Sequence, residues 1–160
     1  MTAKASFTDE EWERVRRAPL VAGMAITIAD PGGPIEISKE GMATLRAATV
    51  PPSQEELLAA VALDIQAMIQ QRHNPAKSYK PKSSADAGTE ILDELRAVDA
   101  IVAAKATPEE TEAFRGWLVM TAQAAADAAK EGGFIGFGAE QVSAGEQAML
   151  DQLRGALGQG

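Results

Sequence analysis

The fold class is indicated most clearly by residues 107–129, TPEETEAFRGWLVMTAQAAADAA. Thr107 and Glu110 form a capping-box pattern, in which each side chain satisfies a backbone N–H of the first helical turn. Large apolar side chains then recur at spacings of three and four, which predicts one face of a helix: Phe114, Trp117 and Leu118. The alanines at 122–129 have high helix propensity and small side chains. We therefore expect this half of the helix to lie very close to a neighbouring helix.

The same start signal recurs on both sides of this stretch. It occurs as Thr8 with Glu11, Ser53 with Glu56, and Ser143 with Glu146. Ser38 is expected to cap a further helix, and a long helix is expected from Thr8 towards Asp30. Apolar stripes fill the middle of the chain at 57–69 and 91–102, and the alternation of a half-buried strand is confined to the brief fragments ITI and IEI. The sequence predicts an all-α fold, a compact bundle of about six helices.

The chain of 160 residues has the length of one ordinary domain, 1–160. Two segments break the helical pattern: a basic loop rich in Pro, Lys and Ser at 70–85, and a loop rich in Gly and Phe at 132–142. A helix that ends in ADPGGP and restarts as ISKEGMATLRA is echoed by one that ends in AAKEGGF and restarts as VSAGEQAMLDQLRGA. This echo suggests a pseudo-twofold helix–loop–helix repeat, although such helix pairs are common enough to match by chance.

Composition excludes several classes of function. The absence of Cys excludes disulfides and thiolate chemistry, and His-based triads are nearly ruled out because the single His, His73, would have to act alone. The net charge of −8 argues against general nucleic-acid binding. No secretory or membrane-spanning run is evident, so we expect a cytoplasmic protein. We find no catalytic constellation and expect no enzyme, because the neutral polar candidates in apolar stretches are only Gln66, Thr121 and Gln123. A cavity lined by these three side chains would favour catalysis on a small molecule instead.

The segment GGFIGFG at 132–138 combines four glycines with three large apolar residues, Phe134, Ile135 and Phe137. Glycine leaves the backbone free to adopt unusual conformations, whereas exposed apolar side chains favour contact with something other than water. One interpretation is a loop that docks on a partner, on a second copy or at a membrane interface. The alternative is that the three side chains fold inward and cover the core.

The segment RHNPAKSYKPKSS at 72–84 gathers cations around one aromatic residue, which suits an acidic partner surface or a phosphate backbone. Its candidate contact residues are Lys77, Tyr79, Lys80 and Lys82. A solvated linker accounts for the same composition. Around PGGPIEIS, the carboxylates of Asp30, Glu36 and Glu40 could supply oxygen ligands to calcium or magnesium. Their alternative role is to favour helix ends electrostatically.

The second half, DAIVAAKATPEETEAFRGWLVMTAQAAADA through VSAGEQAMLDQLRGALG, resembles the tellurite-resistance TerB-like helical domains. The resemblance covers about residues 98–157 and, more faintly, 19–47. It implies acidic metal-binding loops, a role in stress response and protein partners. Asp30 and Glu40 match positions where the family tends to have acids. In the second loop the family's aspartate-glycine pattern is replaced by apolar residues, which argues against a metal site there.

From these features we expect a non-enzymatic protein-interaction or self-assembly module that needs no cofactor. Its partner would be another protein or a second copy of the chain, because alanine-rich helix faces permit close packing between subunits as well as within one. The alternative is a metal-responsive stress protein of the TerB-like kind that binds calcium or magnesium.

Overall fold

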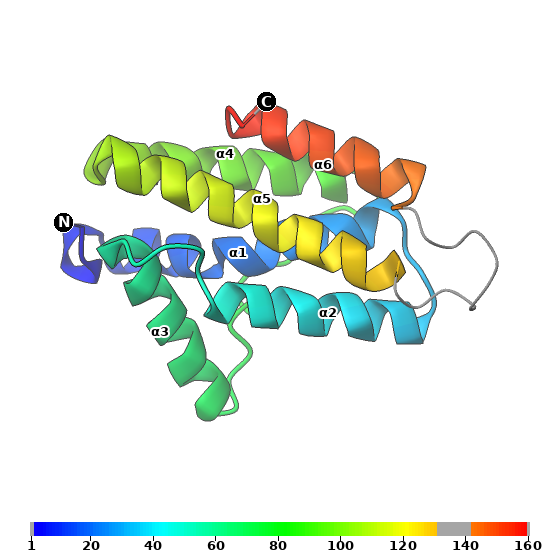
Figure 1. Ribbon diagram of the computed structural model, residues 1–160, viewed down its shortest axis with the longest axis horizontal. Coiled ribbons are helices and arrows are strands. Elements are labelled where there is room, and N and C mark those ends of the chain that lie inside the picture. The colour runs from blue at the N-terminus through cyan, green and yellow to red at the C-terminus, as the bar shows by residue number, and fades with distance from the viewer. Residues whose placement is uncertain (1, 131–141, 160) are drawn as a thin grey trace.

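The computed structural model describes residues 2–130 and 142–159. Within these residues the chain forms helices and no strands, and the helices pack against one another over long sequence distances, so the all-α prediction is confirmed (Figure 1). A short 3-10 turn, Lys4–Ser6, precedes the α-helices. The helices are α1 (Asp9–Ala29), α2 (Pro34–Thr49), α3 (Glu56–Gln70), α4 (Ala87–Lys105), α5 (Pro108–Lys130) and α6 (Ala144–Ala156).

Helix α1 is the centre of the bundle, because it packs against each of the other five described helices. Its middle is apolar on all sides, with Val15, Val21 and Ile26 completely buried, as expected for a helix enclosed by neighbours. In Figure 1, α5 crosses in front of α1, α2 runs along one side of the bundle, and α3 projects away from it at a steep angle. No described helix is both long and apolar enough to cross a membrane.

The predicted capping boxes at Thr8, Thr107 and Ser143 are confirmed. In each, the hydroxyl accepts a hydrogen bond from the backbone N–H three residues on, at 3.1–3.2 Å, and the Glu carboxylate accepts one from the cap residue's own N–H. The box predicted at Ser53 is wrong. Helix α3 begins at Glu56 without a side-chain cap, and the Ser53 hydroxyl lies 3.5 Å from the backbone nitrogen of Glu55.

The predicted start of the second helix at Ser38 is also wrong, because α2 already begins at Pro34. Proline suits this position, since its missing N–H would have no partner in the first turn and its fixed φ is already helical. The Glu36 carboxylate completes the start by accepting a hydrogen bond of 2.7 Å from the backbone N–H of Gly33. The earlier start adds a full turn, which carries Ile35 and Ile37.

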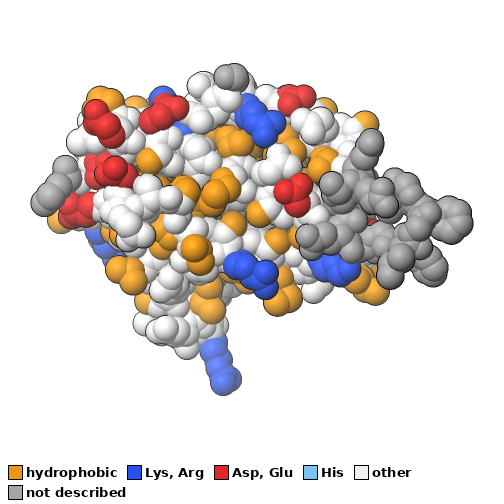
Figure 2. All heavy atoms as spheres, in the orientation of Figure 1, with side chains coloured by type: hydrophobic (Ala, Val, Ile, Leu, Met, Phe, Trp, Pro, Cys, Tyr) orange, Lys and Arg blue, Asp and Glu red, His pale blue; other side chains and the backbone are white. Residues whose placement is uncertain are grey.

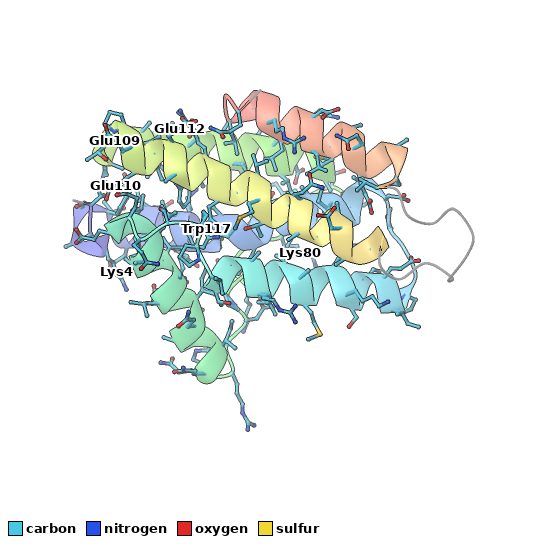
Figure 3. All side chains as sticks on the ribbon, in the orientation of Figure 1. Lys4, Lys80, Glu109, Glu110, Glu112 and Trp117 are labelled. Carbon is cyan, nitrogen blue, oxygen red and sulfur yellow. The ribbon has the colours of Figure 1, made fainter. Side chains whose placement is uncertain are left out.

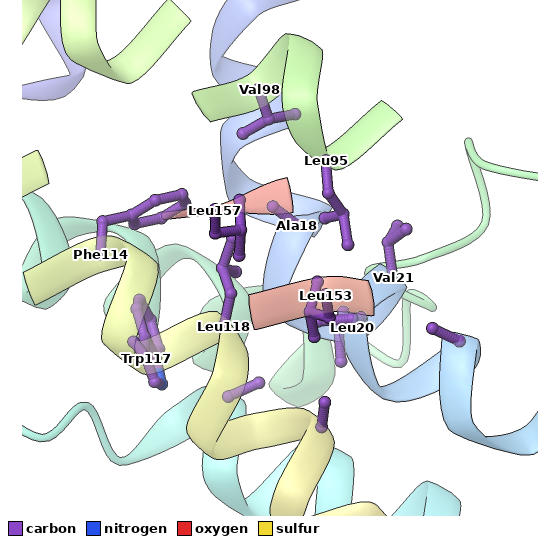
Figure 4. Close-up of a cluster of buried hydrophobic side chains, with 14 of the residues drawn as sticks. Ala18, Leu20, Val21, Leu95, Val98, Phe114, Trp117, Leu118, Leu153 and Leu157 are labelled. Atoms are coloured by element: carbon purple, nitrogen blue, oxygen red, sulfur yellow. The ribbon is translucent and has the colours of Figure 1, made fainter. Parts of the chain in front are cut away.

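One apolar core connects all six helices (Figure 4). Helix α5 contributes Phe114, Trp117 and Leu118, which share this core with Leu95 and Val98 of α4, Leu153 of α6 and Leu157, the residue after α6. The helices of the predicted repeat are present as α1 and α2 and as α5 and α6. Their pseudo-twofold relation stays a prediction.

Candidate functional site

Helix α2 packs inward through small and polar residues. Its buried positions are Glu40, Thr44 and Ala48, spaced four apart and therefore on one side of the helix. Across this side the chain comes close to α1, because a Cβ placed on Gly23 would lie only 2.2 Å from the Thr44 hydroxyl. It also meets α5, where the Trp117 indole donates a hydrogen bond of 2.9 Å to the Ala47 carbonyl (Figure 3). The large apolar side chains of α2 are consequently left on the outside.

These outward residues form what we call the α2 face: Ile35, Met42, Leu45 and Val50. Ile35 is 73% exposed, Met42 and Val50 are each 63% exposed, and Leu45 is 38% exposed. Single exposed apolar residues are ordinary on a protein surface, whereas several in succession on one helix mark a contact surface. Helix α2 and the residue after it thus present an uncovered apolar stripe.

Two hollows adjoin along this stripe. One, of about 730 Å³, lies between α2 and α5 and is lined by Met42, Val50, Ala124 and Ala128, among others. The second, of about 440 Å³, lies between α2 and α3 and is lined by Leu45, Val50 and Ile69, among others. Arg46 and Val50 line both hollows, so the two adjoin at these side chains. In Figure 2 hydrophobic side chains gather over the part of the surface that α2 and α5 form, with Lys and Arg side chains along its α2 edge.

The charged side chains beside the α2 face are mainly positive, although the chain as a whole is acidic. Lys39 and Arg46 line the first hollow from α2, and Asp127 lines it from α5. None of the ion pairs formed among residues 2–130 and 142–159 includes Lys39 or Arg46. By contrast, Arg14 and Arg17 of α1 are held by Glu94 of α4. Among the described residues, these two cations of α2 thus have no acidic partner.

The alanine-rich half of α5 lies where the sequence places it, against neighbouring helices. Ala122, Ala125 and Ala126 are completely buried, and α5 packs most extensively against α1 and α2. Ala124 and Ala128, on another side of the same helix, line the hollow beside α2. Small residues thus serve both close packing inside the bundle and the floor of the hollow.

The candidate residues of the basic segment do not form one cluster. Lys77 lines a hollow of about 650 Å³ beside α1 and the end of α3, whereas Tyr79, Lys80 and Lys82 together line a different one beside α4. Tyr79 is half-buried against the core, and the Arg17 guanidinium lies 5.2 Å from the centre of its ring. Arg17 also donates hydrogen bonds to the carbonyl and the hydroxyl of Ser78. The segment is thus fastened to α1 at Ser78 and Tyr79.

The candidate metal ligands lie near the junction of α1, α2 and α6. Glu40 is 1% exposed, and burial raises its pKa although the Thr27 hydroxyl donates a hydrogen bond to it. Asp30 and Glu36 raise the pKa of Glu40 further. Glu146 of α6, which the sequence does not suggest as a ligand, also has a raised pKa, mainly through burial and then through the charges of Glu40, Asp30 and Glu36. Among the described residues no three His, Asp or Glu side chains are arranged to hold one metal ion.

The neutral polar side chains considered for catalysis do not meet in a cavity. Gln66 donates a hydrogen bond to the Thr49 carbonyl, Thr121 is buried and donates to the Trp117 carbonyl, and Gln123 donates to Asp127 of its own helix. The structure thus commits each of them to a local contact.

Phe134, Ile135 and Phe137 lie outside the described residues. Comparison of the chain with models of protein families, with curated proteins and with solved structures returns no match. The case for a function therefore depends on the described surface, where the α2 face is the feature that sequence reasoning missed. It was hard to see because Glu40, Thr44 and Ala48 have the composition of a solvent-facing stripe, whereas Met42 and Leu45 have that of a buried one.

Proposed function

We propose that this chain is a non-enzymatic protein-interaction module that binds another polypeptide through the α2 face. The observation that carries the proposal is that two hollows adjoin along a helix whose large apolar side chains are exposed. Covering such a surface removes apolar area from water, which is the main favourable term in most protein association. The alanine-lined side of α5 is part of this surface. A contact role for Phe134, Ile135 and Phe137 stays a prediction, because these residues lie outside the described part of the chain.

The experiment has two arms. Light scattering after size-exclusion chromatography, repeated over a wide concentration range, measures self-association. Selection of binders from a library of displayed helical peptides measures recognition of a foreign polypeptide. We expect at least one arm to report binding, and we expect the double substitution Met42→Ser with Val50→Ser to abolish it, because both side chains line the hollows.

The matched control is Ile37→Ser. Ile37 lies on α2 and is 42% exposed, but it stands about 200° around the helix from Ile35 and lines neither hollow. Binding should survive this substitution. Binding that tolerates the double substitution as well, or no binding in either arm, contradicts the proposal.

A second candidate function, a calcium- or magnesium-responsive protein, is favoured by one observation. Two buried carboxyl groups, those of Glu40 in α2 and Glu146 in α6, have raised pKa values, in part through the charges of Asp30 and Glu36. A divalent cation would relieve this mutual repulsion. This second function predicts that millimolar calcium or magnesium raises the melting temperature of the chain in a dose-dependent way and that Glu40→Gln removes this rise. An unchanged melting temperature argues against this function.

A further inference from the structure

The α2 face carries a pattern of charge as well as apolar area. Lys39 and Arg46 are seven residues apart on α2, so they lie on the same side of the helix about 10 Å from each other. Met42 stands between them and is 63% exposed. On α3, the wall of the second hollow is formed by the uncharged residues Gln66, Ile69 and Gln70. Within the described part of the chain, Asp127 on the α5 side is the only acid that lines either hollow.

We propose that the α2 face binds an amphipathic helix of another protein whose apolar stripe is flanked by carboxylates along the edge nearest α2. This inference depends on the proposed function and adds the chemistry of the partner. A helix fits because the hollows follow α2 lengthwise, and ridges of side chains from one helix pack into the grooves beside another. Apolar residues at spacings of three, four and seven would fill the hollows in succession.

The acidic flank follows from the position of the charges. A partner helix with carboxylates seven residues apart would match the spacing of Lys39 and Arg46, neither of which pairs with an acid among the described residues. Asp127 on the opposite wall would repel carboxylates on the other edge. The surface therefore selects which edge of the partner helix is acidic and, with it, the rotation of that helix in the groove.

A second copy of this chain fits the same surface less well. A twofold contact sets one patch against itself, so α2 would face α2 of the copy. Each copy would bring the two cations Lys39 and Arg46 to the contact. Among the described residues that line the hollow, only Asp127 would balance their charge. The two chains would also repel each other through their net charge of −8 apiece. A foreign acidic helix does not bring a second set of α2 cations to the contact, and its carboxylates can pair with both Lys39 and Arg46.

The experiment measures fluorescence anisotropy of two synthetic helical peptides with the intact chain. Both carry leucines along one stripe. One has glutamates along one flank, and the other has lysines at the same positions. We expect the chain to bind the acidic peptide at least about tenfold more tightly than the basic one, and we expect Lys39→Glu with Arg46→Glu to reverse this preference.

The matched control is Lys77→Glu with Lys80→Glu, which changes the net charge of the chain equally but lies away from the α2 face. It should keep the preference for the acidic peptide. Far-ultraviolet circular dichroism and the melting temperature establish that both double variants are folded. A preference that both double variants lose equally reflects net charge alone and overturns the inference.

Other results overturn the inference while sparing the proposed function. One such result is that the chain binds both peptides with equal affinity and that only the double substitution Met42→Ser with Val50→Ser abolishes this binding. Another is a dimer, seen by light scattering, that the same apolar substitutions dissociate, because the occupant is then a second copy. If the chain instead sediments with phosphatidylserine-containing vesicles through the α2 face and binds neither peptide, the surface recognises a membrane. The inference and the proposed function then fail together. If neither peptide binds, the inference fails, and the proposed function fails with it only if the peptide library also yields no binder and the chain stays monomeric.

Discussion

At the scale of single residues, the buried carboxyl of Glu40 is the most unusual feature of α2. It takes the position that an apolar side chain would normally occupy and is almost completely shielded from water. Burial raises its pKa, and the neighbouring charges of Asp30 and Glu36 act in the same direction. The folded state therefore favours the protonated form of Glu40 more than the unfolded state does. The stability that follows from this difference is fully present below the unfolded-state pKa and is lost as the pH rises through the folded-state pKa.

We predict that Glu40→Gln stabilises the metal-free protein at neutral pH. Glutamine keeps an oxygen that can accept the Thr27 hydrogen bond and has no charge to bury. The gain over the natural chain should be larger at pH 7 than at pH 5, because at lower pH Glu40 itself is increasingly protonated. Urea unfolding of both proteins at the two pH values measures the difference. A gain that does not change between them argues against a raised pKa.

The capping residues provide a matched pair. Thr8 caps α1 with its hydroxyl, whereas Ser53 caps nothing. We predict that Thr8→Ala lowers the free energy of unfolding by about 1 kcal/mol, the usual loss for an N-cap. Ser53→Ala should change it by less than about 0.5 kcal/mol, as is usual for a surface position. Equal effects in urea unfolding would show that the hydroxyl of Thr8 is not what starts the helix.

At the scale of elements, the contact of α1 with α2 is set by the absence of a side chain at Gly23. A Cβ at this position would lie within 2.8 Å of three Thr44 side-chain atoms, and Thr44 itself is buried. Thr44 is short and branched at Cβ and cannot move its methyl and hydroxyl groups out of the way without a rotamer change. The distance between the two helices is therefore fixed by one glycine.

We predict that Gly23→Ala lowers the free energy of unfolding by about 1–3 kcal/mol, the range for overpacking a core. The control is Gly41→Ala in α2, where a Cβ would meet nothing within 4 Å. That substitution should raise the free energy of unfolding by about 0.5–1 kcal/mol, because alanine loses less backbone entropy than glycine in a helix. Thermal and urea unfolding of the two variants should thus move in opposite directions.

At the scale of the whole molecule, the six helices share one core, so we predict a single cooperative unfolding transition. Trp12 of α1 and Trp117 of α5 report on different parts of that core by fluorescence, and circular dichroism reports on all helices. The two signals should change at the same urea concentration. Two separate transitions would contradict a single core.

The same core allows a further comparison of positions. Leu118→Ala should lower the free energy of unfolding by about 2–5 kcal/mol, because Leu118 is completely buried. Leu63→Ala should lower it by less than about 0.5 kcal/mol, because Leu63 is 64% exposed on α3. Urea unfolding of the two variants measures both values. A large loss at Leu63 would mean that this side chain is covered in solution, as it would be in an assembly.

The sequence by itself determined the helical class and the starts of α1, α5 and α6. These depend on neighbours one to four residues apart: the capping boxes at Thr8, Thr107 and Ser143, and the apolar stripes of α3, α4 and α5. It misplaced the starts of α2 and α3 because a capping signal is short and the chain offers more of them than it uses. The close packing of the alanine-rich half of α5 was likewise predictable, since small side chains let helices approach.

Only the tertiary structure decided which side of α2 is buried. Periodicity gives two stripes on α2, one of Glu40, Thr44 and Ala48 and another of larger apolar residues, and it favours burying the second. The bundle buries the first stripe for two reasons. Gly23 of α1 has no side chain, which lets Thr44 approach closely, and the Trp117 indole of α5 donates a hydrogen bond to the α2 backbone. The candidate site exists because residues distant in sequence fix that orientation, and no local pattern contains it.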